Sequence, residues 1–225
     1  MSPTTLAFDV YGTLIDTQGV ESKLNELVGD IATEFSKTWR EKQLEYSFRR
    51  GLMENYENFA VCTKDALEYT CIYYKVSLTT EDKGELLNSY RTLPAHKDVK
   101  EGLAKLKAAN FRLYAFSNGR ADAVDELLTA AGIRDYFLGI ISADDLKSFK
   151  PNPAVYQHFL VTSGSPANNS WLISSNPFDV IGAISAGMKA AWIQRSKDAI
   201  FDPWGIEPTI TVEVITRLHD GIKGI

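Results

Sequence analysis

The sequence of 225 residues is poor in the side chains that most often build metal sites and disulfide frameworks. It has only two cysteines and three histidines. His96, His158 and His219 are scattered along the chain, and no Cys/His spacing resembles that of a metal site. Cys62 and Cys71 lie within one helical pattern, whereas secreted chains held by disulfides usually contain more cysteine. We therefore expect a reduced chain without a structural disulfide and without a bound metal.

Excess positive charge and long apolar runs are also missing. Lysine and arginine total 24 against 29 acidic residues, which gives a net charge of -5. A nucleic acid or an anionic membrane attracts a basic surface, so neither is an expected partner. No apolar run reaches about 18 residues, and no basic segment followed by an apolar stretch begins the chain. The sequence therefore predicts no membrane span and no signal peptide, and favours a cytoplasmic location.

A short stretch near the start carries the first functional pattern. Leu6-Ala7-Phe8 is an apolar run that stops at Asp9 and is followed closely by Gly12 and Thr13. This pattern predicts a buried strand that ends at a carboxylate and opens a tight turn. In open α/β sheets, ligands bind at the carboxyl ends of the strands. Taken alone, Asp9 is more typical of a turn residue that hydrogen-bonds nearby amides.

The next part of the chain has a helical pattern throughout. After a polar connection over 16–19, apolar residues recur at three- and four-residue spacing. The predicted helices span 20–28, 31–52, 63–74 and 80–90, with Thr80 as the N-cap of the last and Lys83 where a capping box would favour Glu or Gln. No strand is legible in this region, which is typical of a helical cap domain inserted after a first strand.

Strands and helices alternate over the rest of the chain. We expect strands over 111–116, 139–142, 170–174 and 190–193, and helices over 98–109, 121–131, 178–186 and 212–222. Asn152-Pro153 predicts the start of one more helix, with Asn152 as its N-cap and Pro153 in its first position. This alternation indicates a parallel sheet covered by helices on both faces. The predicted fold class is therefore α/β, with a Rossmann-like core of residues 1–15 and 95–225 and an all-helical cap of residues 16–94.

Polar residues follow several of these strands. They are Asp9 to Thr13, Ser117-Asn118, Lys150, and Ser174 to Asn176 together with Asp179. Each group has an ordinary structural explanation: a turn, a solvated loop charge, or an acid in the first turn of a helix. Because a parallel sheet would bring all four groups to one edge, a shared active site explains them better than four separate coincidences.

These segments, in this order and spacing, resemble the four motifs of the haloacid dehalogenase superfamily. The segment Trp39 to Tyr46, and Lys150-Pro151 followed by Tyr156, further resemble the L-2-haloacid dehalogenases. The resemblance covers nearly the whole chain. It implies a hydrolase that converts short-chain L-2-haloacids into D-2-hydroxy acids with inversion at C2, through an ester on Asp9. Its partners would be the haloacid, water and the released halide, with no cofactor.

Two positions argue against the phosphatases of the same superfamily. Those enzymes carry a second Asp two residues after the nucleophile, which protonates the leaving alkoxide, but Tyr11 stands there. They also use acidic residues of the fourth motif to hold Mg²⁺, where this chain has Ser174-Ser175-Asn176. A departing halide needs no proton. A metal-dependent phosphatase and a catalytically silent binding protein of the same fold are the remaining alternatives.

The residues and the resemblance together assign roles. Lys150 opposes the cost of desolvating an ionised Asp9, and Ser117 with the Val10 and Tyr11 amides suits the substrate carboxylate. The resemblance adds Arg40 and Asn118 around the halide, and Asp179 and Asn176 around the hydrolytic water. The expected catalytic residues are Asp9, Thr13, Arg40, Ser117, Asn118, Lys150, Tyr156, Ser174, Asn176 and Asp179. The expected substrate-binding residues are Val10, Tyr11, Arg40, Leu44, Phe59, Ser117, Asn118 and Phe178.

Two positions depart from the family pattern. Glu41 stands where an uncharged Gln is more usual, and Phe178 stands where Trp is expected. Both bear on the size and charge of the pocket, and therefore on the preferred substrate. Leu44 and Phe59 match the apolar lining, although helix-face residues of this kind also pack in cores. The apolar stripe of the cap fits a homodimer and core packing equally well.

Overall fold

The computed structural model describes residues 3–225 and contains one six-stranded sheet in the order β3-β2-β1-β4-β5-β6. Every pair of neighbouring strands in it is parallel. The strands are β1 (Thr5–Phe8), β2 (Arg112–Ser117), β3 (Gly139–Ser142), β4 (Ser170–Ser174), β5 (Lys189–Ile193) and β6 (Ile210–Val212). The strand order reverses at β1, which places a topological switch point beside its carboxyl end.

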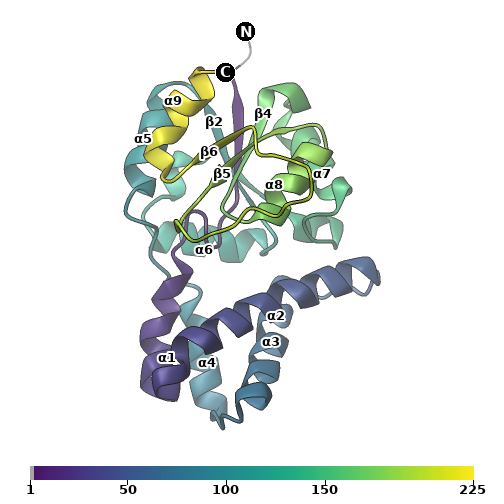
Figure 1. The fold of residues 1–225 in the computed structure, drawn as a ribbon. Helices are drawn as coiled ribbons and strands as arrows, with labels where there is room; N and C mark the ends of the chain where they lie inside the picture. Colours follow the sequence, from purple (N-terminus) through teal and green to yellow (C-terminus); the bar gives the residue numbers. More distant parts are fainter. Residues whose placement is uncertain (1–2) are drawn as a thin grey trace.

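Helices cover both faces of this sheet (Figure 1). They are α5 (Val99–Ala108), α6 (Ala121–Ala130), α7 (Pro153–Ser163), α8 (Pro177–Ser185) and α9 (Leu218–Lys223). Because strand side chains alternate between faces, Leu6 and Phe8 pack in one buried cluster with residues of α5, α6 and α9. Ala7 packs in the other cluster, with residues of α7 and α8. The predicted α/β fold class is confirmed.

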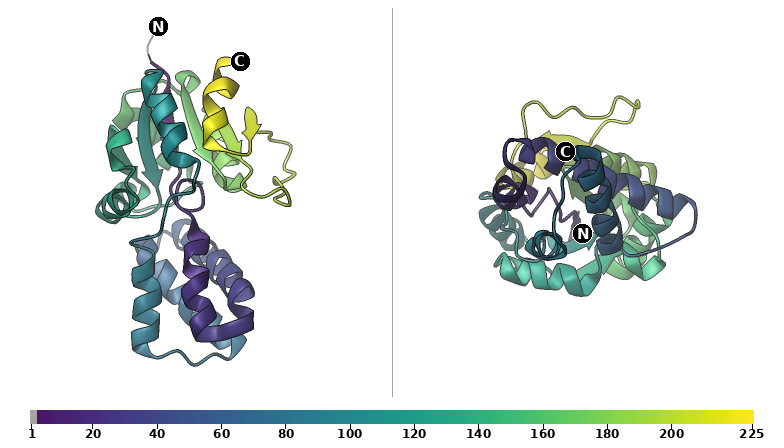
Figure 2. Two further views of the ribbon diagram at one scale, coloured as in Figure 1. Left: turned by 90° about the vertical axis from the view of Figure 1, so that its left-hand side faces the viewer. Right: turned by 90° about the horizontal axis from the view of Figure 1, so that it is seen from below.

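Four helices form a separate group beyond the carboxyl ends of the strands (Figures 1 and 2). They are α1 (Glu21–Val28), α2 (Ala32–Leu52), α3 (Phe59–Tyr74) and α4 (Thr80–Ser89). The two connections to the sheet run side by side, since the Asp16 amide donates to the Pro94 carbonyl at 2.8 Å. The group therefore leaves and rejoins the sheet at one place, as an inserted cap requires. The exact division into residues 16–94 and the remainder stays a prediction.

Two of the cap helices begin earlier than predicted. Helix α4 has Thr79 as its N-cap instead of Thr80. The reason is a capping box, in which Asp82 and Thr79 each accept a hydrogen bond from the other's backbone amide. Helix α3 begins at Phe59, four residues before the predicted start, because Asn58 accepts hydrogen bonds from the two amides that follow Phe59.

The C-terminal prediction of one helix over 212–222 is wrong. Ile210–Val212 forms β6, a 3-10 turn follows over Ile215–Arg217, and α9 begins only at Leu218. The strand exists because it pairs with β5, and the turn is held by Asp98, whose carboxylate accepts from the Ile215 amide at 2.6 Å. Both contacts come from distant parts of the chain. No helix within residues 3–225 has the length and apolarity needed to cross a bilayer.

Candidate active site

The carboxyl ends of the central strands bring the predicted polar groups together. Phe8 of β1 lies opposite Ala115 of β2 and Ile173 of β4. Asp9, which follows Phe8, therefore lies beside the ends of both neighbouring strands. Of the groups expected at this edge, those that hydrogen-bond the Asp9 carboxylate directly are Thr13, Lys150, Ser174 and Asn176.

The Asp9 carboxylate is 8% exposed and held differently at its two oxygens. Oδ2 accepts hydrogen bonds from Thr13 Oγ1 at 2.8 Å, Asn176 Nδ2 at 2.8 Å and Ser174 Oγ at 3.2 Å. Within residues 3–225, Oδ1 accepts only from Lys150 Nζ, at 3.2 Å. Oδ2 is therefore saturated with donors, while Oδ1 keeps a lone pair for chemistry.

Lys150 is a buried ammonium and not a solvated loop charge, because its side chain is 1% exposed. Its Nζ also donates to Asp179 Oδ2 and to the Phe116 carbonyl, both at 2.8 Å. Burial opposes the charge, but the nearby Asp179 and Asp9 carboxylates outweigh it and raise the pKa of Lys150. The Lys150 amide donates to Asn118 Oδ1 at 2.8 Å, which fixes the loop that carries the ammonium.

Asp179 holds Lys150 from the side away from Asp9. Its Oδ1 accepts from the Tyr156 hydroxyl at 2.8 Å, and its Oδ2 from Lys150. Burial raises the pKa of Asp179 to about 6, with a further increase from the charge of Asp9, although Lys150 acts in the opposite direction. Two carboxylates thus share one ammonium. Both oxygens of Asp179 are engaged, so its expected contact with the hydrolytic water stays a prediction.

The raised pKa of Asp179 predicts an acid limb in the activity profile. As the pH falls through about 6, Asp179 takes up a proton and its ion pair with Lys150 is lost. The orientation of the ammonium beside Asp9 then weakens, so kcat/KM should fall with decreasing pH. Initial rates between pH 4.5 and 8.5 with L-2-chloropropionate, which remains ionised throughout, measure this. A profile that stays flat down to pH 5 would contradict the assignment.

Three donors close to Asp9 are free to hold an anion. The Ser117 hydroxyl oxygen accepts from the Gly119 amide at 3.0 Å, so its own proton is left for another acceptor. Within residues 3–225, the amides of Val10 and Tyr11 also donate no hydrogen bond. These three groups can therefore donate to an anion, and their contact with a substrate carboxylate stays a prediction.

Arg40 approaches from helix α2 of the cap. Its guanidinium donates from one Nη to Gln43 Oε1 at 2.6 Å and forms no ion pair within residues 3–225. It lies near the Tyr11 and Tyr90 phenols, whose pKa values burial raises to about 12. No hydrogen bond joins Arg40 to Asn118 in the described chain, so their joint contact with a halide stays a prediction.

The apolar residues expected to line the site pack across the boundary between cap and core. The Phe59 ring lies 6.3 Å from that of Tyr11 and 6.3 Å from that of Phe149. Phe178 of α8 meets Phe48 of α2 edge-on at 5.0 Å. Leu44 packs against the same small cluster as Phe59, so both serve the core, and the contact of Leu44 with a substrate stays a prediction.

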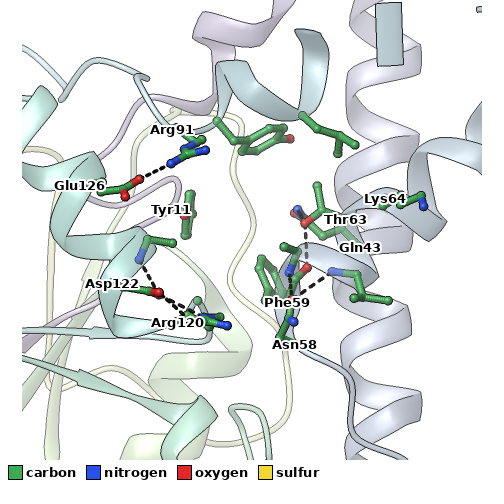
Figure 3. Close-up of a pocket in the computed structure, with 16 residues that line it drawn as sticks. Tyr11, Gln43, Asn58, Phe59, Thr63, Lys64, Arg91, Arg120, Asp122 and Glu126 are labelled. Atoms are coloured by element: carbon green, nitrogen blue, oxygen red, sulfur yellow. Dashed lines mark hydrogen bonds and ion pairs between the residues drawn. The ribbon is translucent and has the colours of Figure 1, made fainter. Parts of the chain in front are cut away.

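A cavity of about 530 Å³ opens beside these rings (Figure 3). Tyr11 lies on one side of it, and Gln43, Phe59 and Thr63 lie opposite, on the cap. Its lining does not include Asp9. The cavity therefore lies between cap and core beside Tyr11, two residues after Asp9, without reaching Asp9 itself.

Sequence reasoning missed three supporting residues. Ser175 donates from its amide to Thr13 Oγ1 at 2.8 Å, and Arg195 donates from Nη2 to the Thr13 carbonyl at 2.6 Å. Gln43 holds Arg40, as described above. Arg195 follows strand β5 at the same sheet edge, and Gln43 lies three residues after Arg40 on one helix face. The positions of Arg195 and Gln43 could be inferred from the sequence, but an arginine or a glutamine at such a position does not by itself indicate a catalytic role.

The donor set does not fit a magnesium site of the phosphatase kind. Mg²⁺ favours carboxylate oxygens, and the two carboxylates here share the Lys150 ammonium between them. The segment that follows β4 offers hydroxyl and amide groups in place of carboxylates. Among residues 3–225, no group of three or more His, Cys, Asp or Glu side chains is placed to hold a metal ion.

Comparisons with known proteins agree with this geometry. A family model for haloacid dehalogenase-like hydrolases matches residues 3–187. An (S)-2-haloacid dehalogenase of Pseudomonas sp. (strain YL) is 34% identical over 90% of this chain and 87% of its own. Haloacetate dehalogenase H-2 of Moraxella sp. (strain B) is 33% identical over 95% of each chain. The solved L-2-haloacid dehalogenase of Xanthobacter autotrophicus with covalently bound chloropropionic acid is 27% identical, covers 100% of both chains and has a TM-score of 0.90. The chain belongs to the haloacid dehalogenase-like hydrolases, in the family of the (S)-2-haloacid dehalogenases.

Proposed function

We propose that the protein hydrolyses short-chain L-2-haloacids to D-2-hydroxy acids and halide, through an ester on Asp9. The observation that carries this proposal is the asymmetric hold on the Asp9 carboxylate: in the described part of the chain, three donors contact Oδ2 and Lys150 alone contacts Oδ1. Relatives that are named for this activity, one of them solved with covalently bound chloropropionic acid, support it.

In the first step, Asp9 Oδ1 attacks C2 of the haloacid. An oxygen–carbon bond forms while the carbon–halogen bond breaks, and the electron pair leaves with the halide. Ser117 and the Val10 and Tyr11 amides hold the substrate carboxylate, and placement of this kind supplies several kcal/mol of barrier reduction. Asn118, whose Oδ1 is engaged by the Lys150 amide, keeps its Nδ2 hydrogens for an anion.

In the second step, water attacks Cγ of Asp9. Negative charge develops on Oδ2, where Thr13, Ser174 and Asn176 already donate. Donors fixed in advance at a developing oxyanion are worth about 3–4 kcal/mol each in other hydrolases. The bond between Cγ and Oδ1 then breaks. Oδ1 leaves in the product hydroxyl with one proton of the water, the other proton is released to solvent, and the water oxygen stays on the Asp9 carboxylate.

The stereochemistry of the product tests the proposal. Asp9 belongs to the core and Arg40 to the cap, so nucleophile and leaving halide flank C2 in line. A single displacement inverts C2, and the second step does not touch that carbon. L-2-chloropropionate should therefore give D-lactate, with halide release unaffected by EDTA. The D-enantiomer should react poorly because its halogen points away from Arg40.

Chiral chromatography of the product and halide titration, both with EDTA present throughout, measure these outcomes. L-lactate or a racemate would contradict the in-line displacement. Loss of activity in EDTA with recovery in Mg²⁺ would instead favour the phosphatase, and no halide release from any haloacid would favour the silent binding protein.

The remaining features of the proposal concern the setting of the enzyme. Both cysteines, Cys62 and Cys71, are buried free thiols, which suits the reducing cytoplasm. Exposed apolar side chains at the end of α2 and on α3, among them Leu52 and Ile72, fit a homodimer. Sedimentation measures that oligomeric state.

A further inference from the structure

Gln43, which holds Arg40, is a buried polar residue of the cap. Its side chain is 1% exposed and lies on α2, one turn after Arg40. Its Oε1 accepts from the Arg40 guanidinium at 2.6 Å, and its Nε2 donates to Thr63 Oγ1 at 2.5 Å. Burying an amide is costly unless its hydrogen bonds are made, so these two bonds define what the residue does.

Thr63 fixes which way the amide of Gln43 points. The Thr63 hydroxyl donates its single proton to the Phe59 carbonyl at 2.9 Å, so its oxygen can only accept a further hydrogen bond. The Gln43 Nε2 group must therefore face Thr63, and Oε1 must face Arg40. A relay of three hydrogen bonds thus ties the guanidinium to the backbone of α3.

The acceptor that holds Arg40 is neutral. Nearby, the Tyr11 and Tyr90 phenols are uncharged, since burial raises the pKa of each to about 12. Within residues 3–225, no carboxylate forms an ion pair with Arg40. A neutral clamp fixes the direction of a guanidinium and leaves its positive charge unneutralised, which is what attraction of an anion requires.

We propose that Gln43, locked by Thr63, is a positioning residue that aims Arg40 at the departing halide while leaving its charge uncompensated. This inference rests on the proposed function. It extends that function to two residues that do not touch the substrate. Its effect should appear in the step that breaks the carbon–halogen bond, and most strongly for the poorer leaving group.

Variants of Thr63 and Gln43 separate this role from packing. Gln43→Met keeps the length of the side chain, and Thr63→Val keeps its shape, but each breaks the relay. We expect each to lower kcat/KM for L-2-chloropropionate about tenfold, as for loss of a hydrogen bond to a charged group. The loss for L-2-bromopropionate should be about threefold, because bromide leaves more readily and depends less on Arg40. Thr63→Ser, which keeps the hydroxyl, should restore the wild-type ratio of the two substrates.

Thr70→Val is the matched control. Thr70 lies on the same helix, is also buried and donates to the Ala66 carbonyl at 2.7 Å in the same way, but within residues 3–225 it forms no hydrogen bond with Gln43. It should lower the melting temperature as Thr63→Val does. The ratio of kcat/KM for L-2-bromopropionate to kcat/KM for L-2-chloropropionate should stay at the wild-type value. If Thr63→Val and Thr70→Val give the same ratio, the relay only stabilises the cap and the inference fails.

Gln43→Glu tests the charge. A carboxylate at this position still accepts from Arg40, and it accepts from Thr63 once the Thr63 hydroxyl turns its proton away from the Phe59 carbonyl. The clamp on Arg40 is therefore kept while the guanidinium is neutralised. Inhibition by added bromide should weaken about tenfold. Unchanged bromide inhibition would overturn the inference, whereas absence of halide release by the wild-type protein would overturn the proposed function itself.

Discussion

Asp9→Asn is expected to lower kcat by about 10⁴-fold or more while leaving the fold intact. The amide has nearly the same shape as the carboxylate, but its oxygen is uncharged and is a weak nucleophile. Three of the four donors around Asp9 contact Oδ2, so the side chain remains held. Halide release under saturating L-2-chloropropionate measures the loss, and circular dichroism checks the fold.

Asp145→Asn serves as the control for Asp9→Asn, because Asp145 is an exposed carboxylate after β3 with a side chain 52% exposed. Its activity should equal that of the wild type. Activity of Asp9→Asn within tenfold of the wild type would show that water attacks the substrate directly.

Lys150→Met is expected to lower kcat/KM at least about a thousandfold and to destabilise the protein by about 3–5 kcal/mol. The ammonium is 1% exposed and lies between two carboxylates, so its removal leaves Asp9 and Asp179 as unpaired buried charges. Denaturant unfolding measures the stability, and halide release measures the activity.

A second variant separates the two effects of Lys150. Adding Asp179→Leu to Lys150→Met removes the deeper of the two unpaired carboxylates, since Asp179 is 0% exposed. More than half of the free energy of unfolding that Lys150→Met loses should be recovered, but halide release should not return. Recovery of both would mean that Lys150 is only structural, and recovery of neither would mean that the charge balance described here is wrong.

The sequence predicted the sheet and the cap because each depends on local pattern. The apolar run before Asp9 and the strand-helix alternation after residue 95 are visible without tertiary contacts. The prediction of one helix over 212–222 was wrong because that region depends on contacts with distant parts of the chain. Strand β6 exists only through its pairing with β5, and the turn at Ile215 depends on Asp98.

The sequence predicted which residues form the candidate site, but it did not predict the hydrogen bonds and ion pairs among them. Asp9, Lys150 and Asp179 follow different strands, so their shared sheet edge could be inferred. The sequence did not predict that the Lys150 ammonium bonds both carboxylates or that Asp179 is fully buried. Both features depend on side-chain packing between positions up to 170 residues apart in the chain. Gln43 gave no such pattern, because its role depends on a threonine of another helix.

The central claim is that Asp9 forms an ester whose own carbonyl is hydrolysed, and a single turnover in ¹⁸O water tests it most directly. With enzyme in excess over L-2-chloropropionate, the account predicts that ¹⁸O enters the Asp9 carboxylate while the lactate hydroxyl carries ordinary oxygen. Mass spectrometry of the peptide that contains Asp9, together with that of the lactate, measures both. Label in the lactate hydroxyl with none on Asp9 would contradict the account.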